Sequence, residues 1–363
     1  MAGQVEGKSR KSATEPKPET TGATINANPR LQSYYASLES VLGYDALLGG
    51  TRHFGYYDSA ATLNPFPISR ALRRMEEELF RALRLRTDGG SRPRALDAGC
   101  GYGHVARYMV RKGVRVTGID VVERHLRKAR ETAAREAGRR DGEGEAGKLE
   151  VRHMDYHHLE ALADESFDAV YTMETFVHAT DPEQVLAGFF RVLKPGGRIA
   201  MHEYDHVLEE VEAADKSGEA DGDKKKNGDR DGDGKGKGGK APGTDLRRAM
   251  RQVNEWSAMP TNAISSPGAY RRMLEGAGFV DVEVRDLSAH IRPMTRLFYV
   301  LAIVPFYIIR LLGLERYFVN TVAGVGAYRG YGFWRYVQVR AMKPGEGAMV
   351  EEEEGEEEEE VLL

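Results

Sequence analysis

Apolar residues between positions 93 and 208 fall into short runs that are separated by stretches of helical spacing. The runs at 95–97, 114–119, 149–152, 167–172 and 198–202 have the length and composition of buried strands. The stretches between them that predict helices are 104–112, 123–137 and 182–193. Strands and helices therefore alternate, which predicts an α/β fold with a mostly parallel sheet and helices on both faces.

The hydrophobic pattern continues on both sides of this unit. Upstream, Tyr35, Leu38 and Leu42 recur at roughly helical spacing, and residues 68–85 predict an amphipathic helix. Downstream, a helix that ends at 276–278 is followed by strand-like segments at 279–286 and 333–342. The pattern thus predicts a helical cap before the α/β unit and two further strands after it.

A long apolar excursion, residues 291–332, separates the last two predicted strands. Its core, 294–318, is apolar nearly all round, and Pro305 interrupts its longest apolar run, 297–309. That run is too short for a clean transmembrane helix. A helix packed on the domain, a lid over an apolar substrate and a membrane anchor lying in the plane of the bilayer all fit this segment.

Polar, low-complexity segments divide the chain into regions. We expect disorder in a tail at 1–30, an insertion at 209–243 and an acidic tail at 344–363, because these stretches hold few large apolar residues. The ordered regions are then a cap at 31–92, a core at 93–208 and a C-terminal part at 244–343 that contains the apolar excursion. The insertion mixes both signs of charge, so it is not a nucleic-acid tail.

Cysteine usage and the N-terminus bear on the compartment. Cys100 is the only cysteine, which excludes an internal disulfide and fits a reducing environment. The N-terminus is polar and shows no signal peptide. We therefore expect an intracellular, cytoplasmic protein.

The glycine-rich turn at 97–103, Asp-Ala-Gly-Cys-Gly-Tyr-Gly, connects the first predicted strand to the first helix. Its glycines permit a tight turn and let backbone N–H groups approach a ligand closely. The G-x-G-x-G spacing lacks the glycine that a dinucleotide motif needs at the sixth position, where this chain has His104. The Asp97 carboxylate suits an amino group better than a pyrophosphate, and Asp120, after the second strand, can accept from ribose hydroxyls.

This arrangement resembles motif I of the class I S-adenosylmethionine (SAM) methyltransferases. The resemblance includes Gly118-Ile-Asp120, Phe167-Asp168 and Leu193-Lys-Pro-Gly-Gly197. It implies a Rossmann-like, seven-stranded fold with SAM as cofactor and no metal. The residues it assigns to the cofactor are Asp97, Gly99, Cys100, Gly101, Gly103, Asp120, Val121, Asp155, Tyr156 and Glu174. Taken alone, Asp155 would also suit the cap of a helix at 157–162.

Other segments resemble the sterol 24-C-methyltransferase and UbiE-like branch of these enzymes. Met173-Glu174-Thr-Phe-Val-His178-Ala is similar to the Glu-Ala-Thr-x-His-Ala segment of sterol methyltransferases, and Glu203-Tyr204 stands where those enzymes have Glu-Trp. The His-Phe-Gly-Tyr segment at 53–56 resembles their aromatic segment ahead of motif I. The chain lacks their Tyr-Glu-x-Gly-Trp pattern and carries the 209–243 insertion.

The resemblance implies C-methylation of an alkene in a sterol or another isoprenoid lipid. Methylation of an alkene leaves a carbocation, so aromatic faces and carboxylates would stabilise it and a base would remove a proton. Glu174 and His178 are the catalytic candidates. Candidate substrate or lid residues are Tyr35, His53, Phe54, Tyr56, Tyr57 and Glu203. The alternatives are that the aromatic loop packs on the core and that His178 is a polar core residue.

Two other functions fit the same residues. One is a secondary-metabolite O-, N- or C-methyltransferase for a polyketide, terpenoid or alkaloid, and the other is a non-catalytic, membrane-associated protein that keeps the fold. For both methyltransferase interpretations, the expected partner is a hydrophobic small-molecule substrate rather than a nucleic acid. Segment 294–318 would contact a membrane surface, such as the cytosolic face of the endoplasmic reticulum or a lipid droplet.

Overall fold

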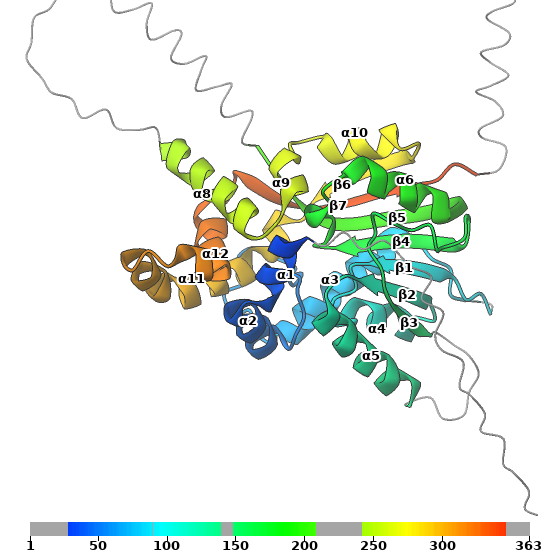
Figure 1. The fold of residues 1–363 in the computed structure, drawn as a ribbon, viewed down its shortest axis with the longest axis horizontal. Coiled ribbons are helices and arrows are strands. Elements are labelled where there is room, and N and C mark those ends of the chain that lie inside the picture. Colours follow the sequence, from blue (N-terminus) through cyan, green and yellow to red (C-terminus); the bar gives the residue numbers. More distant parts are fainter. Residues whose placement is uncertain (1–27, 89, 139–147, 208–241, 346–363) are drawn as a thin grey trace, which may run out of the picture.

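A computed structural model describes residues 28–88, 90–138, 148–207 and 242–345. Almost all of the predicted N-terminal tail, the 209–243 insertion and the acidic C-terminal tail lie outside the described residues. The described residues form one sheet that is covered by helices, with a helical unit at one end (Figure 1).

The sheet of the described chain has seven strands in the order β3-β2-β1-β4-β5-β7-β6. The strands are β1 (Arg94–Ala98), β2 (Arg115–Asp120), β3 (Leu149–His153), β4 (Phe167–Met173), β5 (Leu193–His206), β6 (Val280–Asp286) and β7 (Trp334–Met342). The first five strands pair in parallel, and β7 runs antiparallel between β5 and β6. This confirms the predicted seven-stranded, mostly parallel Rossmann-like fold.

Helices cover both faces of the sheet (Figure 1). They are α1 (Pro29–Ala36), α2 (Leu38–Leu48), α3 (Ile68–Leu83), α4 (His104–Arg111), α5 (Glu123–Ala137), α6 (Pro182–Val192), α8 (Pro242–Trp256), α9 (Pro260–Ile264), α10 (Ala269–Gly276), α11 (Ser288–Leu311) and α12 (Val319–Arg329), with short 3-10 turns η1 (Phe176–His178) and η2 (Glu315–Tyr317). Helices α3 and α4 bury Met75, Leu79 and Met109 against one face. Helices α6 and α10 bury Phe189 and Leu274 against the other, so the domain has three layers.

Two local expectations differ from the structure. The Lys-Pro-Gly-Gly segment, predicted as a stop before a strand at 198–202, belongs to a longer strand, β5. Hydrogen bonds from Gly196 N to Lys343 O (3.0 Å) and from Lys343 N to Gly197 O (2.9 Å) hold it beside the end of β7. Residues 157–162 form turns rather than the helix that Asp155 would cap.

The N-terminal cap lies over the carboxyl ends of the parallel strands. Gln32 Nε2 of α1 donates to Val121 O at 3.0 Å, directly after β2. Asp45 of α2 pairs with Arg124 of α5 at 2.9 Å. These contacts place α1 and α2 above the glycine-rich turn, which is the edge where open α/β sheets bind ligands.

The predicted apolar excursion forms α11, η2 and α12, inserted between β6 and β7. Met294 and Leu297 of α11 pack with Leu48 and Leu72 of the cap. The far half of α11 projects beyond the sheet (Figure 1). The first half of α11 therefore packs against the cap, and its second half extends away from the sheet.

Candidate cofactor and active site

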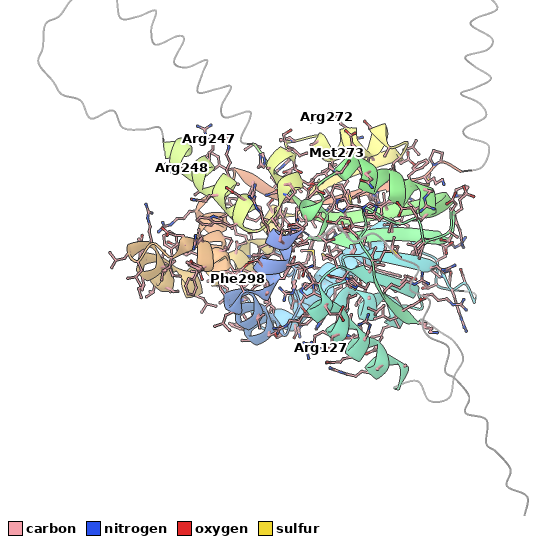
Figure 2. The ribbon with its side chains drawn as sticks, viewed as in Figure 1. Arg127, Arg247, Arg248, Arg272, Met273 and Phe298 are labelled. Atoms are coloured by element: carbon pink, nitrogen blue, oxygen red, sulfur yellow. The ribbon has the colours of Figure 1, made fainter. Side chains whose placement is uncertain are left out.

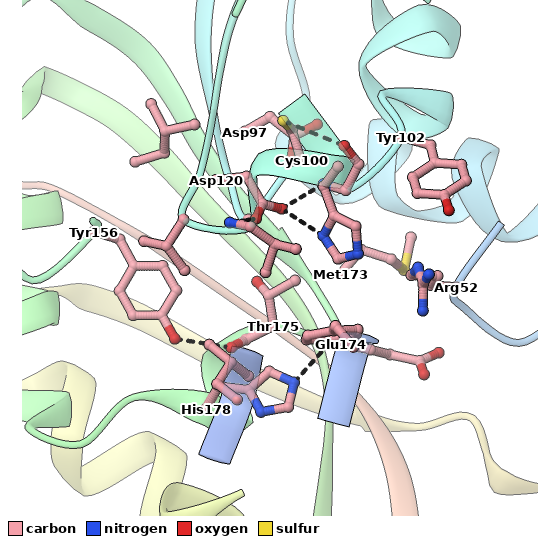
Figure 3. A pocket seen from close by; sticks show the side chains of 18 of the residues that line it. Arg52, Asp97, Cys100, Tyr102, Asp120, Tyr156, Met173, Glu174, Thr175 and His178 are labelled. Atoms are coloured by element: carbon pink, nitrogen blue, oxygen red, sulfur yellow. Dashed lines mark hydrogen bonds and ion pairs between the residues drawn. The ribbon is translucent and has the colours of Figure 1, made fainter. Parts of the chain in front are cut away.

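A cavity opens at the carboxyl ends of β1, β2 and β4, beneath the cap. It is lined by residues of the glycine-rich turn, of the segments after β2, β3 and β4, and of the loop after α2. The space between these residues, with open solvent at its mouth included, measures about 980 Å³. Figure 3 shows the side chains of Asp97, Asp120, Arg52 and Tyr156 around it.

The glycine-rich turn brings the backbone close to the segment after β4. Gly99 has φ +95°, and a Cβ there would lie 2.7 Å from the Thr175 side chain. Thr175 Oγ1 in turn donates to Ala98 O at 2.6 Å. A side chain at position 99 would therefore both strain the backbone and separate the two segments that form the cavity floor.

Asp97 is a buried carboxylate among the residues that line the cavity. The residue is 2% exposed, and its Oδ2 has no hydrogen-bond partner among the described residues. Burial raises the pKa of the Asp97 carboxyl to about 7. The Tyr171 hydroxyl opposes this shift. Burial of a carboxylate with so few donors is unfavourable, so this position suits a ligand that brings an ammonium group.

Asp120 is held as an ionised acceptor. Its carboxylate accepts from Gly101 N (2.9 Å) and Val122 N (2.8 Å), and His125 Nδ1 lies 3.2 Å away. Burial opposes ionisation, but His125 and the two backbone N–H groups outweigh it and hold the pKa of Asp120 below its usual value. An ionised acid at the end of β2 can accept further hydrogen bonds from ligand hydroxyls.

Arg52 supplies a half-buried cation, which the sequence interpretation missed. Its guanidinium carbon lies 5.1, 4.6 and 5.2 Å from the ring centres of Tyr35, Tyr44 and Tyr102. The Nε and Nη2 atoms have no hydrogen-bond partner in the described part of the chain. Nη1 donates to Ser40 Oγ at 3.4 Å. Burial lowers the pKa of Arg52, but the hydroxyls of the surrounding tyrosines, that of Tyr102 included, raise it above its ordinary value. A guanidinium held between rings suits a carboxylate. The only sequence signal was its position one residue before the His53 segment.

The segment after β3 forms the far wall of the cavity. Asp155 accepts from the backbone N of His157 at 2.9 Å, and His157 Nδ1 lies 2.6 Å from the same oxygen. The Tyr156 hydroxyl donates to Thr175 O at 3.0 Å, which fixes its ring beside the cavity. Asp155 and Tyr156 thus line the cavity as predicted, and His157 joins them.

Glu174 is a buried carboxylate with several donors around it. Oε1 accepts from Phe54 N (2.8 Å) and from the Tyr336 hydroxyl (2.9 Å), and Oε2 accepts from the Tyr204 hydroxyl. The residue has φ +57°, an uncommon backbone conformation for a non-glycine residue. Burial raises the pKa of Glu174, although these donors oppose the shift. Three donors are therefore directed at this carboxylate.

His178 is committed to two hydrogen bonds. Nδ1 lies 2.8 Å from Ala258 O, so this nitrogen carries the proton and donates. Nε2, 2.9 Å from the Tyr35 hydroxyl, therefore accepts from that phenol. Burial lowers the pKa of His178 to about 4, which keeps the ring neutral near pH 7.

Glu203 lies beneath the cavity rather than in it. Its side chain is 0% exposed and accepts from Thr172 Oγ1 (2.7 Å), Phe176 N (2.9 Å) and Val177 N (3.3 Å). These bonds hold the segment that carries Glu174 and His178. The structure therefore gives Glu203 a positioning role, in place of the predicted substrate contact.

The predicted residues divide into those that the fold brings together and those that it does not. The predicted residues that line the cavity are Asp97, Gly99, Cys100, Gly101, Asp120, Val121, Asp155, Tyr156, Glu174, His178, Tyr35 and His53. Gly103 instead starts α4 and packs near Ala129. Tyr56 stacks on His290 at 4.2 Å between ring centres, and the Tyr57 hydroxyl donates to Pro65 O, so both pack away from the cavity.

Phe54 is not among the residues that line the cavity and lies between Glu174, which is, and α11. Its backbone N contacts Glu174, and its ring centre lies 5.6 Å from that of Tyr336, 6.4 Å from that of Trp334 and 5.9 Å from that of Phe298. Phe298 sits where α11 meets the cap (Figure 2). These rings form an aromatic wall that runs from Glu174 to the insertion and lies outside the residues that line the cavity.

The donor set suits SAM. Its methionine part carries one ammonium and one carboxylate group, which match the Asp97 carboxylate and the Arg52 guanidinium in charge. Asp120 matches the ribose hydroxyls. In the described residues, no group of three or more His, Cys, Asp or Glu side chains is arranged to hold a metal ion.

Comparison with known proteins places this site in a family context. The model of the methyltransferase domain family matches residues 96–201. The chain is 42% identical over 318 residues to the S-adenosyl-L-methionine-dependent Diels-Alderase iccD of Talaromyces variabilis, covering 88% of this chain and 96% of that protein. It is 41% identical over 259 residues to the Diels-Alderase iliD of Neonectria sp. (strain DH2), covering 71% of this chain and 86% of that protein.

A solved structure agrees on the fold. The [4+2]-cyclase SpnF matches with a TM-score of 0.56 at 21% identity, over 86% of this chain and 96% of that chain. At this identity the match concerns the fold alone. The match to iccD is of another kind, because it covers nearly the whole of both chains at 42% identity.

Proposed function

This chain belongs to the class I SAM-dependent methyltransferase family, and within that family we propose that it is a SAM-binding Diels-Alderase of secondary metabolism. Its substrate is an apolar polyene that undergoes an intramolecular [4+2] cycloaddition. A relative of that activity supports this assignment, because the two proteins are 42% identical over 88% of this chain. The sterol branch and alkene C-methylation remain the second candidate.

The cofactor role follows from the donor set. Asp97 would hold the ammonium group, Arg52 the carboxylate and Asp120 the ribose hydroxyls of SAM, since all three residues line the cavity. Bound SAM supplies a sulfonium, which is a fixed positive charge and, in methyl transfer, the methyl source. Tyr35 closes the cap over this site through its bond to His178.

The single structural observation that carries the proposal is the state of the two candidate bases. His178 uses both ring nitrogens in hydrogen bonds, and Glu174 accepts three. Methyl transfer to a hydroxyl or an amine needs a base to take a proton. A cycloaddition needs none, because a diene and an alkene join by forming two σ bonds and one new π bond from three π bonds.

For such a reaction the protein must hold the polyene folded, with its reacting carbons close together and away from water. The wall formed by Phe54, Phe298, Trp334 and Tyr336 supplies apolar, rigid surface beside the cofactor site. It runs from Glu174, which lines the cavity, toward α11.

The second candidate rests on Glu174 and its surroundings. Alkene methylation leaves a carbocation, and a buried carboxylate among aromatic rings would stabilise it. Glu174 lines the cavity, and Tyr204 and Tyr336 donate to it. The two candidates therefore share one site and differ in whether the methyl group leaves SAM.

Product mass separates them. The purified protein is incubated with a synthetic linear polyene that carries a diene and a tethered alkene, and with sterol and isoprenoid alkenes. The cofactor arms are methyl-labelled SAM, S-adenosylhomocysteine and no cofactor. We expect an isomer of the polyene, formed only with cofactor present, and no label in the product. A labelled product one CH₂ heavier, with release of S-adenosylhomocysteine, would replace our assignment by the second candidate. SAM binding without turnover would favour the non-catalytic alternative.

A further inference from the structure

The outer half of α11 carries an apolar face that nothing in the described chain covers. Its exposed members recur at three- and four-residue spacing, and they are Val300 (61%), Val304 (67%), Tyr307 (55%), Ile308 (55%) and Leu311 (85%). Leu301 and Leu312 widen this face, and Tyr317 and Phe318 in and after η2 extend it. Only 17% of the most apolar window of this helix is buried. We call these residues the α11 face.

The inner half of α11 is fixed to the domain. Ile291 and Met294 are fully buried, and Arg296 donates to the carbonyls of Ala60 and Thr62 at 3.1 Å each. The helix is long and apolar enough to cross a bilayer by length and composition. Because its first turns belong to the protein core, however, only the outer turns are free to enter an apolar phase. This geometry suits shallow insertion rather than crossing.

Cations and tyrosines border the α11 face. Exposed Arg310 and Arg316 stand at its C-terminal end, and the Arg329 guanidinium donates to the Tyr307 hydroxyl at 3.0 Å. Residues 288–332 carry five arginines and one acid, Glu315. Arginine and tyrosine are the residue types that sit at a lipid–water boundary, with apolar parts inward and polar ends at the headgroups.

We propose that the α11 face docks onto an anionic lipid bilayer surface, with its apolar side chains in the outer acyl region and the arginines at the lipid phosphates. Charge complementarity selects this occupant. Docking of a second copy would bring two arginine-bordered patches together. Each patch has only Glu315 to pair with the arginines, so like charges would repel. The same helix also reaches the aromatic wall, because Phe298 of α11 contacts Phe54. Lipid docking would therefore bring this wall close to the bilayer.

Vesicle flotation tests the proposal. The full chain is mixed with vesicles of phosphatidylcholine alone, or of phosphatidylcholine with phosphatidylserine. We expect flotation with the phosphatidylserine vesicles, and weaker flotation with phosphatidylcholine alone or at high salt, because salt screens the arginines. The variant V304E/L311E should lower the bound-to-free ratio at least about tenfold, since it places carboxylates in the acyl region.

Three further variants sharpen the result. The matched control L63E changes an apolar residue that is 84% exposed but lies outside the α11 face, and it should float like wild type. R310Q/R316Q should lose most of the preference for phosphatidylserine. D97N removes the cofactor contact and should still float, so membrane docking is tested independently of the proposed function. All substituted side chains of the α11 face are exposed, and unchanged SAM affinity and melting temperature verify folding.

Two outcomes would overturn the proposal. One is the absence of wild-type flotation with phosphatidylserine vesicles, or equal flotation of V304E/L311E. The other is a wild-type dimer in light scattering that V304E/L311E converts to a monomer, without vesicle binding. That second result would assign the α11 face to self-association instead.

Discussion

The Tyr35 hydroxyl donates to Nε2 of His178 across 2.9 Å, joining the cap helix α1 to the segment after β4. The two residues are 143 positions apart in the chain. Because Nδ1 of the same ring donates to Ala258 O, the imidazole has no free nitrogen for a substrate. His178, a candidate base, therefore holds the cap helix α1 in place over the cofactor cavity.

Removing that bond should weaken cofactor binding without unfolding the protein. A single neutral hydrogen bond contributes about 0.5–1.5 kcal/mol, so Y35F should bind SAM roughly 2–10-fold more weakly by calorimetry. Y57F is the matched control, because the Tyr57 hydroxyl bonds to Pro65 O away from the cavity. Equal SAM affinity for Y35F and Y57F would contradict a lid fastened by Tyr35.

Arg52 should contribute more than Tyr35, since its contact with the cofactor is charged. Hydrogen bonds to charged groups contribute about 1.5–3 kcal/mol, so R52M should lose roughly 10–150-fold in SAM affinity. The control is R74M, which removes an arginine paired with Asp58 on the surface. If R52M bound SAM like wild type, the carboxylate would lie elsewhere.

SAM affinity should depend on pH through Asp97. Burial raises the pKa of this carboxyl to about 7 in the free protein, whereas the bound ammonium group requires the ionised form. Binding therefore releases a proton below pH 7, and affinity should fall about tenfold per pH unit from 7 toward 5. Calorimetry in buffers of different ionisation enthalpy measures this proton directly. D97N should bind weakly at every pH and release none, and a wild-type release of zero would refute the assignment.

Glu174 distinguishes the two candidate reactions. E174Q keeps an acceptor for Phe54 N and the Tyr336 hydroxyl but removes the negative charge. A cycloaddition should keep its rate within about tenfold, whereas a carbocation would lose the stabilising charge and slow by 100-fold or more. The measurement is single-turnover conversion at saturating cofactor. D168N, at a carboxylate that pairs with Lys194 outside the cavity, controls for charge removal alone.

Glu203 should act on stability rather than on substrate. E203A leaves several buried donors unpaired and should lower the free energy of unfolding by about 2–4 kcal/mol in urea titration. Burial raises the pKa of Glu203 to about 7, above its ordinary value of 4.5, so the folded state favours the protonated acid. Its contribution is fully present below pH 4.5 and is lost as pH rises through 7. E203Q mimics the protonated form and should remain near wild-type stability at pH 7. E160A, at an exposed acid, should change nothing.

Local patterns carried most of the fold and the cofactor turn. Alternating strand and helix periods, with glycines after Asp97 and an acid at Asp120, predict a parallel sheet and a ligand at its carboxyl edge, because both features depend on neighbouring residues. The helix at 123–137 and the two acids that follow the first two strands, Asp97 and Asp120, could be predicted for the same reason. Segment 174–178 was also identified, but only as a set of residue types.

Tertiary contacts decided what those residues are available to do. Tyr35 and Ala258 come from distant parts of the chain to occupy His178, and the residues around Glu203 hide it beneath the loop. Arg52 has no motif, and it becomes a site residue because three tyrosine rings from separate elements enclose it. Sequence alone determined the fold and the site of the glycine turn through short-range periodicity. Only the packed structure decided which donors remain free and which face of α11 stays bare, because hydrogen-bond occupancy and burial depend on contacts between segments far apart in the chain.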